Sequence, residues 1–399
     1  MKKSVAIVGG GPAAFMLAAT LDEKKFNVTI YEKNFAVGRK FLVAGDGGFN
    51  LTHSENIEDL ITRYSPVSFL ENCLQAFTNE DLRNWLKRIG VETYVGTSKR
   101  VFPIKGIKPI DVLNAVLNKL KSKKVEIKTL HEWKGWKEND LLFANENNEV
   151  RVAADFVVFG LGGASWKKTG SDGSWKNLFE EKNIPVVPFF PSNCAYEIAW
   201  DEKFLALAEG GSLKNISVTC NNKKKKGELV ITKFGIEGGA VYALSPEIRK
   251  QLLENCKAQI FIDLKPTLSE EEIKTKLGAK RNRSQTKLLA DVLNLSPAKI
   301  ALLKSVLTKE EFTDTDLLSK KIKRVPLQII SAAPIGEAIS TVGGISLNEI
   351  VENFELKKLP HHFAIGEMLD WDAPTGGYLL QACFSMGHWV GERLNKAVL

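Results

Sequence analysis

The stretch Val5-Ala6-Ile7-Val8-Gly9-Gly10-Gly11-Pro12-Ala13-Ala14 decides the fold of this chain of 399 residues. Its first four residues are a short apolar run, which predicts a buried parallel strand. The glycine-rich turn that follows has the pattern G-x-G-x-x-A, with Gly9, Gly11 and Ala14 in the three positions of a dinucleotide-binding turn. Gly9 permits a tight turn, Gly11 lets a pyrophosphate approach the backbone, and the helix start beyond it offers free N–H groups to phosphates.

A second strand and an acidic residue follow the turn at the spacing that a dinucleotide site requires. The strand is expected over residues 27–31, and Glu32 stands directly after it, eighteen residues beyond Ala14. A carboxylate at this position binds a ribose diol in dinucleotide-binding folds. A purely structural βαβ unit with a surface glutamate is the alternative. We therefore predict a Rossmann-like α/β domain at the start of the chain.

Composition places the chain among globular proteins. Hydrophobic residues make up 44% and charged residues 26% of a chain long enough for two or three domains. No apolar run is long enough to cross a bilayer, and the apolar N-terminus contains the glycine turn, so it is a strand rather than a signal peptide. We expect a cytoplasmic protein with no membrane partner. The sequence does not set the oligomeric state, and a monomer is compatible with it.

Cysteine and histidine patterns argue against metal and disulfide chemistry. The five cysteines are scattered along the chain and never form a C-x-x-C pair, and the five histidines contain no H-E-x-x-H motif. We therefore expect no metal site and no disulfide framework.

The net charge of +8 raises the question of a nucleic-acid partner. The one dense basic run, Lys223 to Lys226, lies between two alternating segments at 216–220 and 228–232, which predicts a solvated hairpin loop. The other basic residues are spread along the chain. A nucleic-acid partner is therefore disfavoured.

A second glycine-rich region with cations follows the second strand. It contains Gly38, Arg39 and Lys40, and then Gly48 and Asn50. The cations can neutralise a pyrophosphate or meet an anionic ring, and glycine backbone can lie flat against such a ring. A ligand that is longer than a nicotinamide dinucleotide, with a bulky ring system, would need this additional loop.

Two later segments again combine a buried strand with glycines. Residues 155–165 predict a strand that leads into a glycine turn, and residues 362–371 predict a strand that ends at a glycine and an acid. A helix is expected from residue 378 to residue 394. We interpret these segments as further contacts to the same ligand. The residues concerned are Gly162, Gly163, Gly366, Glu367, Asp370, Gly376, Gly377 and Tyr378.

The middle of the chain predicts an insertion into the dinucleotide-binding sheet. Short strands at 125–130, 141–144 and 150–153 predict a three-stranded meander, and three prolines between 185 and 191 suggest a boundary. Strand character then dominates, short helices follow, and strand character returns near residue 325. We expect a dinucleotide-binding domain over residues 1–188 and 337–399. A β-rich substrate domain is expected over 189–266 and 325–336, and a helical subdomain over 267–324.

Several motifs resemble one known family along essentially the whole chain. The chain is similar to the HI0933-like bacterial flavoproteins, and within them to the PP_4765 flavoprotein subfamily. The motifs lie at residues 44–54, 100–103, 161–166, 227–232 and 366–387. The resemblance implies FAD as cofactor, which we expect to be bound non-covalently. It also implies a Rossmann-like FAD-binding domain split by an inserted β-barrel-like domain and a small helical subdomain. Where the wider group has Arg-Cys-Asn, this chain has Phe49 before Asn50, so no cysteine chemistry carries over.

We therefore predict an FAD-dependent oxidoreductase with hydride transfer at flavin N5. NAD(P)H-linked reduction of a small organic substrate is the first interpretation. An oxygen-using amine or amino-acid oxidase and a flavin-bearing RNA-binding protein are the alternatives. No catalytic acid or base is compelled by the sequence, and His53, Tyr378 and Glu337 are the candidates. The predicted cofactor-binding residues are Gly9, Gly11, Pro12, Ala13, Ala14, Glu32, Lys33, Gly38, Arg39, Lys40, Gly48, Asn50, Gly162, Gly163, Gly366, Glu367, Asp370, Gly376, Gly377 and Tyr378.

Overall fold

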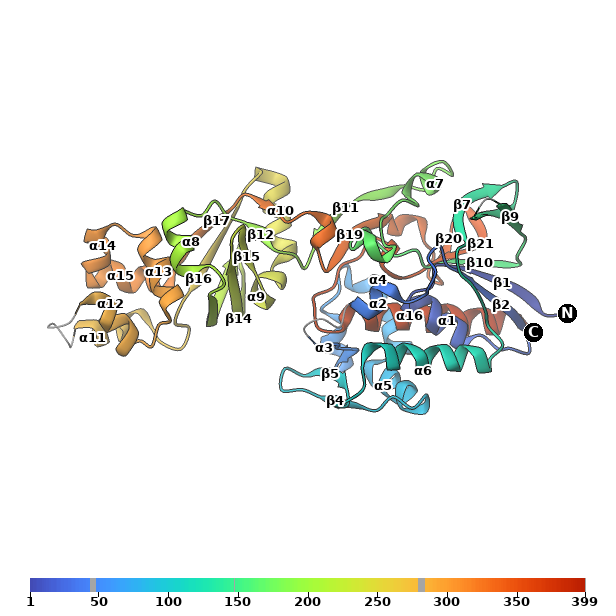
Figure 1. Cartoon of the computed structure of the whole chain (residues 1–399), viewed down its shortest axis with the longest axis horizontal. Coiled ribbons are helices and arrows are strands. Elements are labelled where there is room, and N and C mark those ends of the chain that lie inside the picture. Colours follow the sequence, from blue (N-terminus) through green and yellow to red (C-terminus); the bar gives the residue numbers. More distant parts are fainter. Residues whose placement is uncertain (44–47, 147, 279–283, 399) are drawn as a thin grey trace. The chain divides into compact units, whose positions relative to one another are not determined.

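The computed structural model describes residues 1–43, 48–146, 148–278 and 284–398, and the chain divides into two units (Figure 1). Unit 1 consists of Met1–Phe190 and Ser340–Leu399, and unit 2 of Pro191–Ile339. Part of one family-like motif, residues 44–47, lies outside the described residues. The predicted domain limits, and the separation of a helical subdomain, stay predictions.

A six-stranded sheet organises unit 1, and its strand order is β20-β21-β10-β1-β2-β6. The central strand β1 pairs in parallel with β2 on one side and with β10 on the other, so that Val5 faces both Val28 and Phe156. Strands β6 and β21 extend the parallel sheet outwards, and β20 is antiparallel. This confirms the predicted Rossmann-like sheet. The bounds are β1 (Lys3–Val8), β2 (Phe26–Tyr31), β6 (Glu126–Lys128), β10 (Phe156–Phe159), β20 (Glu355–Leu356) and β21 (Leu359–Ala364).

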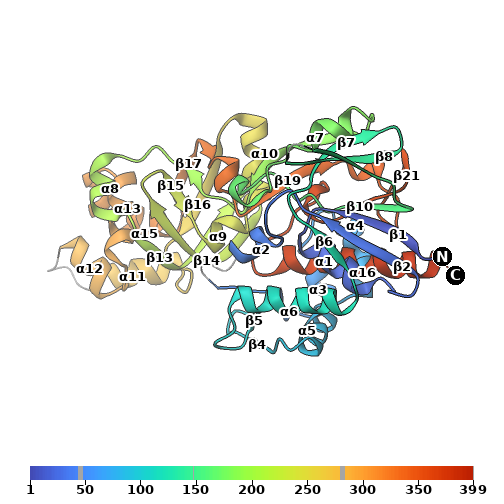
Figure 2. The same ribbon diagram turned by 45° about the vertical axis from the view of Figure 1, so that its right-hand side comes forward.

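Three helices cover one face of this sheet: α1 (Pro12–Thr20), α6 (Pro109–Ser122) and α16 (Tyr378–Ala397) (Figures 1 and 2). Helix α1 is buried from Ala13 to Ala19, which explains why its sequence is apolar on every side. Two glycines of α16 allow the two helices to pack closely. A Cβ atom at Gly387 would lie 2.2 Å from the carbonyl oxygen of Ala13, and one at Gly391 would lie 2.7 Å from the Cβ of Thr20.

The opposite face carries a three-stranded meander of β7 (Glu132–Lys137), β8 (Asp140–Asn145) and β9 (Asn148–Val152) (Figure 2). Aromatic rings join it to the sheet: Phe143 stacks on Tyr31 at 4.5 Å, and Trp133 lies 4.7 Å from Phe159. The strand predicted at 125–130 is present as β6, but its assignment to the meander is wrong. Residues 126–128 pair in parallel with β2 instead, because strand membership depends on long-range pairing that a short run does not reveal.

The remaining elements of unit 1 surround these layers. They are α2 (Arg39–Val43), β3 (Thr52–His53), α3 (Ile57–Ile61), α4 (Val67–Ala76), α5 (Asn79–Arg88), β4 (Thr93–Val95), β5 (Arg100–Pro103), α7 (Lys176–Glu180), β11 (Val186–Ser192) and β19 (Ser340–Ile345). Strands β3, β5 and β4 form a small antiparallel sheet, and β11 pairs with β19.

Unit 2 is built on a seven-stranded sheet with the order β17-β16-β13-β14-β15-β12-β18. Its two edge strands, β17 and β18, are neighbouring parts of the single run 325–332, so the sheet curls back on itself like a barrel. The strands are β12 (Tyr196–Glu197), β13 (Ser212–Cys220), β14 (Lys223–Thr232), β15 (Gly235–Glu237), β16 (Ala258–Asp263), β17 (Val325–Ile329) and β18 (Ser331–Ala332).

Short helices complete unit 2. They are α8 (Glu202–Ala208), α9 (Gly239–Tyr242), α10 (Ser245–Asn255), α11 (Glu270–Gly278), α12 (Gln285–Asp291), α13 (Pro297–Val306), α14 (Lys309–Thr313) and α15 (Thr315–Lys323). Those from α11 to α15 lie where the sequence predicts short helices, whereas α8, α9 and α10 interrupt the stretch that was predicted to be strand-rich. Within the described ranges of both units, no helix has the length and hydropathy needed to cross a bilayer. The same ranges contain no cluster of three His, Cys, Asp or Glu side chains that could hold a metal ion.

The predicted hairpin loop at Lys223 to Lys226 is wrong. These four lysines lie in strand β14, paired in register with Cys220 to Ser217 of β13, and only Asn221 and Asn222 connect the two strands. Asn221 adopts a φ of 50°, the left-handed conformation that two-residue hairpins require and that asparagine tolerates. The turn is therefore shorter than the basic run, and the lysines belong to the sheet surface.

Candidate functional site

A cavity of about 490 Å³ opens at the carboxyl ends of the parallel strands of unit 1. The chain leaves β1 towards β2 on one side and returns on the other side as β10, so this is the point where the strand order reverses. Open parallel sheets bind their ligands at such a point. Twelve of the predicted cofactor-binding residues line the cavity: Gly9, Gly11, Pro12, Ala13, Glu32, Lys33, Gly38, Arg39, Lys40, Gly162, Gly366 and Glu367.

The two fingerprint glycines of the turn are constrained in different ways. Gly9 has a φ of 101°, and a Cβ atom there would lie 2.5 Å from the carbonyl oxygen of Gly160, so only glycine fits the turn. A Cβ atom at Gly11 would meet nothing within 4 Å. Because Gly11 also lines the cavity, its open side leaves room for a ligand to approach the backbone.

The start of helix α1 has no capping side chain. Gly11 is its N-cap residue and Pro12, which has no N–H group, follows it. The first intrahelical bond from a backbone N–H in this turn runs from Phe15 to the carbonyl of Gly11. The N–H groups of Ala13 and Ala14 therefore have no partner within the helix, and together with the helix dipole they favour an anion.

Glu32 lies at the end of β2 and lines the cavity. Its Oε2 accepts a hydrogen bond from the backbone N–H of Gly10 at 2.9 Å, and its Oε1 accepts two from Asn34, at 2.9 Å from the backbone and 2.6 Å from the side chain. The carboxylate thus fixes the glycine turn and the loop after β2. Each carboxylate oxygen has more than one acceptor site, so capacity for a ribose hydroxyl remains.

Four lysines and arginines line the cavity, and they differ in their partners. Lys134 forms an ion pair with Glu132 at 2.6 Å. Lys33 forms an ion pair with Asp172 at 2.8 Å, and Lys40 forms one with the buried Glu367 at 2.7 Å. Arg39 donates instead to the neutral side-chain amide of Asn34, at 2.7 Å. The guanidinium charge is therefore available to an anionic ligand. The open turn, the uncapped helix start, the acid after β2 and this cation fit the ribose and pyrophosphate of FAD.

Eight predicted residues do not line the cavity: Ala14, Gly48, Asn50, Gly163, Asp370, Gly376, Gly377 and Tyr378. The packing explains two of them. A Cβ atom at Gly163 would lie 2.0 Å from Oγ1 of Thr341, and one at Gly377 would lie 2.6 Å from the backbone of Thr52. These glycines are needed for close packing, whether or not they also contact a ligand. The assignment of all eight as cofactor ligands stays a prediction.

Several lining residues have no signal in the sequence. Trp133 and Lys134 come from the meander strand β7, and Ser171 and Trp175 from the segment after β10. None belongs to a glycine motif, and their approach to the cavity depends on how the meander folds over the sheet.

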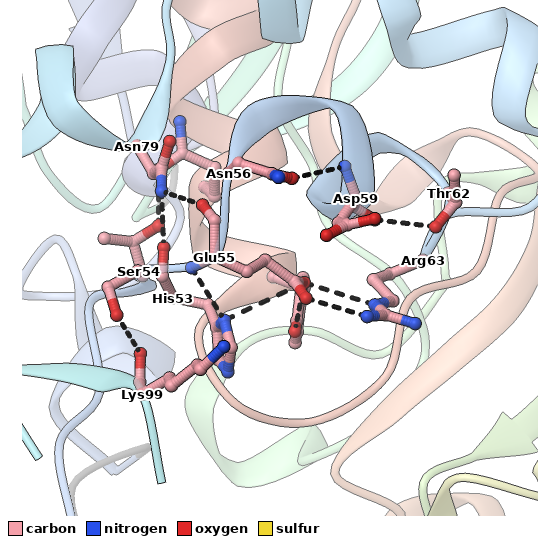
Figure 3. A network of polar contacts seen from close by, with 12 residues as sticks. His53, Ser54, Glu55, Asn56, Asp59, Thr62, Arg63, Asn79 and Lys99 are labelled. Atoms are coloured by element: carbon pink, nitrogen blue, oxygen red, sulfur yellow. Dashed lines mark hydrogen bonds and ion pairs between the residues drawn. The ribbon is translucent and has the colours of Figure 1, made fainter. Parts of the chain in front are cut away.

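Close to the start of α16, a polar network surrounds the buried carboxylate of Glu55 (Figure 3). Arg63 donates to both of its oxygens, at 3.2 and 2.8 Å, and Tyr378 donates its hydroxyl to Oε1 at 2.6 Å. The ring of His53 stacks on that of Tyr378, with the ring centres 5.1 Å apart. The Nδ1 atom of His53 accepts a hydrogen bond from the backbone N–H of Glu55. Asn79 donates to the backbone carbonyls of His53 and Glu55. The network therefore ties the segment after β3 to the start of α16.

The pKa values follow from this arrangement. Burial alone would raise the pKa of Glu55, but the hydrogen bonds from Arg63 and Tyr378 outweigh it, so the pKa lies below its ordinary value. Burial and the bond to Glu55 raise the pKa of Tyr378. Burial lowers the pKa of His53, although the Glu55 carboxylate opposes this shift. At neutral pH the network therefore holds an ionised glutamate, a protonated tyrosine and a neutral histidine.

The three catalytic candidates thus fall into two groups. His53 and Tyr378 are in contact with one another in unit 1. Glu337 is exposed in the short 3₁₀ turn Ile335–Glu337 of unit 2. No observation assigns a catalytic role to any of them.

The sequence model of the HI0933-like protein Rossmann domain matches residues 3–393. The 3-dehydro-bile acid delta(4,6)-reductase of Clostridium scindens is 23% identical over an alignment that covers 97% of this chain and 98% of the relative. The ribosomal RNA dihydrouridine synthase of Haemophilus influenzae is 24% identical and aligned over 96% of each chain. Among solved structures, a flavocytochrome c3 fumarate reductase has a similar fold. The TM-score is 0.53 and the identity 14%, with 100% of this chain and 79% of that chain covered.

Proposed function

The chain belongs to the HI0933-like Rossmann family, and we propose that this FAD-dependent oxidoreductase reduces a carbon–carbon double bond conjugated with a carbonyl group. One observation carries the choice of reaction. The two relatives described above are named as a 3-dehydro-bile acid delta(4,6)-reductase and a ribosomal RNA dihydrouridine synthase, and both names denote the saturation of such a bond. Membership of the PP_4765 subfamily stays a prediction.

The residues of the cavity support the binding of FAD. The N–H groups at the start of α1 and the charge of Arg39 would hold the pyrophosphate, and Glu32 would accept hydrogen bonds from the ribose. When bound, FAD would supply hydride transfer from NADH or NADPH to the carbon β to the carbonyl. A proton would add to the α carbon, so that the nicotinamide is oxidised and the double bond reduced.

The geometry argues against two candidate proton donors. The hydroxyl proton of Tyr378 is held by Glu55, and its loss would place a phenolate beside a carboxylate. Burial raises the pKa of Tyr378, and the hydrogen bond to Glu55 raises it further. His53 is neutral at pH 7, because burial lowers its pKa. We infer that both side chains position the start of α16 and that the proton comes from elsewhere.

A small conjugated ketone and a uracil base in RNA are two candidate substrates for the same chemistry. The distribution of charge favours the second. Unit 2 contains 24 lysines and arginines against 18 aspartates and glutamates, so it carries a net charge of +6 out of the +8 of the chain. A small neutral substrate would not require such a concentration of positive charge, whereas a polyanion would be attracted by it.

The experiment uses the purified, FAD-loaded protein under anaerobic conditions. NADH and NADPH are first tested for their ability to bleach the flavin. The reduced protein is then mixed with a steroid 4-en-3-one, a 4,6-dien-3-one and a uridine-rich RNA, and the products are analysed by mass spectrometry. A gain of two hydrogen atoms in any of them, with reoxidation of the flavin, supports the proposal. Flavin that is reduced by amines and reoxidised by oxygen, with no saturated product, would contradict it and favour an amine oxidase.

A further inference from the structure

One surface of unit 2 combines several cations with an aromatic ring. It lies on strands β14, β13, β16 and β17 and the chain just before β17 (Figure 2). We name it the basic strand face and define it by Lys224, Lys226, Phe261, Lys323 and Arg324. It is separate from the cavity described above, whose lining comes entirely from unit 1.

The strand register places these residues on the side of the sheet away from its core. Phe261 faces Thr219 of β13 and Pro326 of β17, and Thr219 in turn faces Lys224 of β14. The alternate residues of β16, among them Ile260 and Ile262, are fully buried. Because side chains alternate along a strand, Phe261 and Lys224 share the outer side, and Lys226 lies two residues further along the same side.

Arg324 and Phe261 form a flat, partly exposed platform. The guanidinium carbon of Arg324 lies 3.5 Å from the centre of the Phe261 ring, which is the closest cation–π contact recorded in the described residues. Arg324 is exposed and Phe261 is half-buried. Planar guanidinium groups and aromatic rings are the side chains on which unpaired bases stack.

The basic strand face keeps a positive charge after its own ion pairs are taken into account. It forms ion pairs with Asp263, which is buried and lies 2.8 Å from Lys323 and 3.7 Å from Lys224. Glu228, which is exposed two residues beyond Lys226 on the same side of β14, is a second carboxylate. Two carboxylates therefore balance at most two of the four cations. Lys224 remains 54% exposed in spite of its contact with Asp263.

We propose that the basic strand face binds a single-stranded segment of RNA. Lys224 and Lys226, two residues apart on one strand, would contact phosphates, and a base would stack on the platform of Phe261 and Arg324. The charge argues for a polyanion, and the platform argues for one that carries bases rather than for a lipid surface. This proposal rests on the uracil-reducing form of the proposed function, since it gives that substrate a docking surface outside the cavity.

The test measures binding of a fluorescein-labelled 20-nucleotide oligouridine to the FAD-loaded full chain by anisotropy at several salt concentrations. The variant Lys226→Glu/Arg324→Glu changes the face without touching Asp263. The matched control, Lys203→Glu/Lys309→Glu, changes the charge of unit 2 equally at two exposed lysines on α8 and α14. For a single strand, each lost phosphate contact lowers the slope of log K against log salt by about 0.7.

We expect the face variant to bind oligouridine more weakly. The slope of log K against log salt should fall by about 0.7 for the phosphate contact of Lys226, and by up to twice that amount if Arg324 also contacts a phosphate. The control should lose affinity by a smaller factor and keep its slope. Phe261→Leu, which keeps an apolar side chain but removes the ring, should bind about 5- to 100-fold more weakly. Circular dichroism and flavin content of each variant establish that it is folded.

Equal loss of affinity in the face and control variants would overturn the proposal, because it would indicate diffuse attraction to unit 2. Unchanged binding in the face variant would overturn it as well, as would binding to phosphatidylserine vesicles with no binding to oligouridine. The two proposals fail separately. If RNA binds at the face but no uracil is reduced, the proposed function is wrong for RNA and the RNA-binding face stands. If uracil is reduced and the face variant binds RNA normally, the proposed function stands and the RNA-binding face is wrong.

Discussion

The hydroxyl of Tyr378 donates a hydrogen bond of 2.6 Å to the buried carboxylate of Glu55, which lies 323 residues earlier in the chain. Tyr378 is the first residue of α16, and Gly377 before it adopts a φ of 96° with no capping side chain. The bond therefore anchors the start of the longest helix to the segment after β3. It also explains why a tyrosine follows two glycines at this point.

Tyr378→Phe should lower the free energy of unfolding by about 1.5–3 kcal/mol, because it removes a hydrogen bond to a charged group. Urea denaturation of the two proteins measures this difference. Tyr94→Phe is the matched control, since Tyr94 is 49% exposed and its ring stacks on Phe102. Equal losses in the two variants would show that the bond to Glu55 contributes nothing specific.

The contribution of Glu55 should depend on pH. Its pKa in the folded protein lies below the ordinary value of 4.5, so its ionised form stabilises the fold fully above about pH 4.5. As the pH falls through the lowered pKa, the carboxylate is protonated and this stabilisation is lost. The difference in unfolding free energy between the wild type and Glu55→Gln should therefore shrink from about pH 6 to about pH 3. A difference that stays constant over this range would contradict the prediction.

Two alanine substitutions in the glycine turn should affect different properties, one the stability of the fold and the other the affinity for FAD. Gly9→Ala places a Cβ atom 2.5 Å from the carbonyl oxygen of Gly160 at a positive φ, so it should destabilise the fold by roughly 1–3 kcal/mol or more. Gly11→Ala meets no protein atom within 4 Å, so it should fold normally but lose FAD affinity by about tenfold or more. Thermal unfolding and FAD titration of the two variants separate these effects. A Gly11→Ala protein with unchanged FAD affinity would place the pyrophosphate elsewhere.

Glu32→Ala should weaken FAD binding more than it slows the fully loaded enzyme, because a ribose contact acts far from the reacting N5. The loss of a charge-assisted bond corresponds to about 1.5–3 kcal/mol of binding free energy. Glu32→Gln removes the charge but keeps only one acceptor oxygen, which can serve Gly10 or Asn34 but not both, so it should weaken FAD binding and also loosen one of the two loop contacts. Glu92→Ala, at an exposed position, is the control. Slow turnover of the Glu32→Ala enzyme with unchanged FAD affinity would show that Glu32 does not contact the ribose.

The ion pair between Lys40 and Glu367 should show strong coupling in a double-mutant cycle. Lys40→Met leaves Glu367, which is 8% exposed, with the backbone N–H of Thr341 as a remaining donor. Adding Glu367→Gln removes the uncompensated charge, so the double variant should be more stable than the sum of the single changes predicts, by about 0.5–3 kcal/mol. Additive effects in urea denaturation would mean that the pair is screened by solvent.

The sequence predicted the Rossmann sheet because its signals are local. The apolar run of β1, the G-x-G-x-x-A turn and Glu32 lie within thirty-two residues, and each has one stereochemical requirement that the structure meets. The helix from Tyr378 is also confirmed, because its apolar positions recur at helical spacing over twenty residues.

Other features depended on partners that are distant in the sequence. Residues 126–128 joined the parallel sheet through pairing with β2, and Lys223 to Lys226 joined β14 through pairing with β13. Neither run differs locally from a meander strand or a solvated loop. Their positions follow from hydrogen bonds to segments whose location only the complete fold defines.

The sequence by itself therefore determined the type of the sheet, the glycine turn and the acid after the second strand, because neighbouring residues fix the backbone there. Only the tertiary structure decided that Glu55, Arg63 and Tyr378 meet, and that Trp175 lines the cavity beside the turn. It also decided that Arg324 covers Phe261 next to the lysines of β14. The physical reason is that these contacts join separate elements, and their geometry is set by the packing of the whole unit rather than by any single stretch of chain.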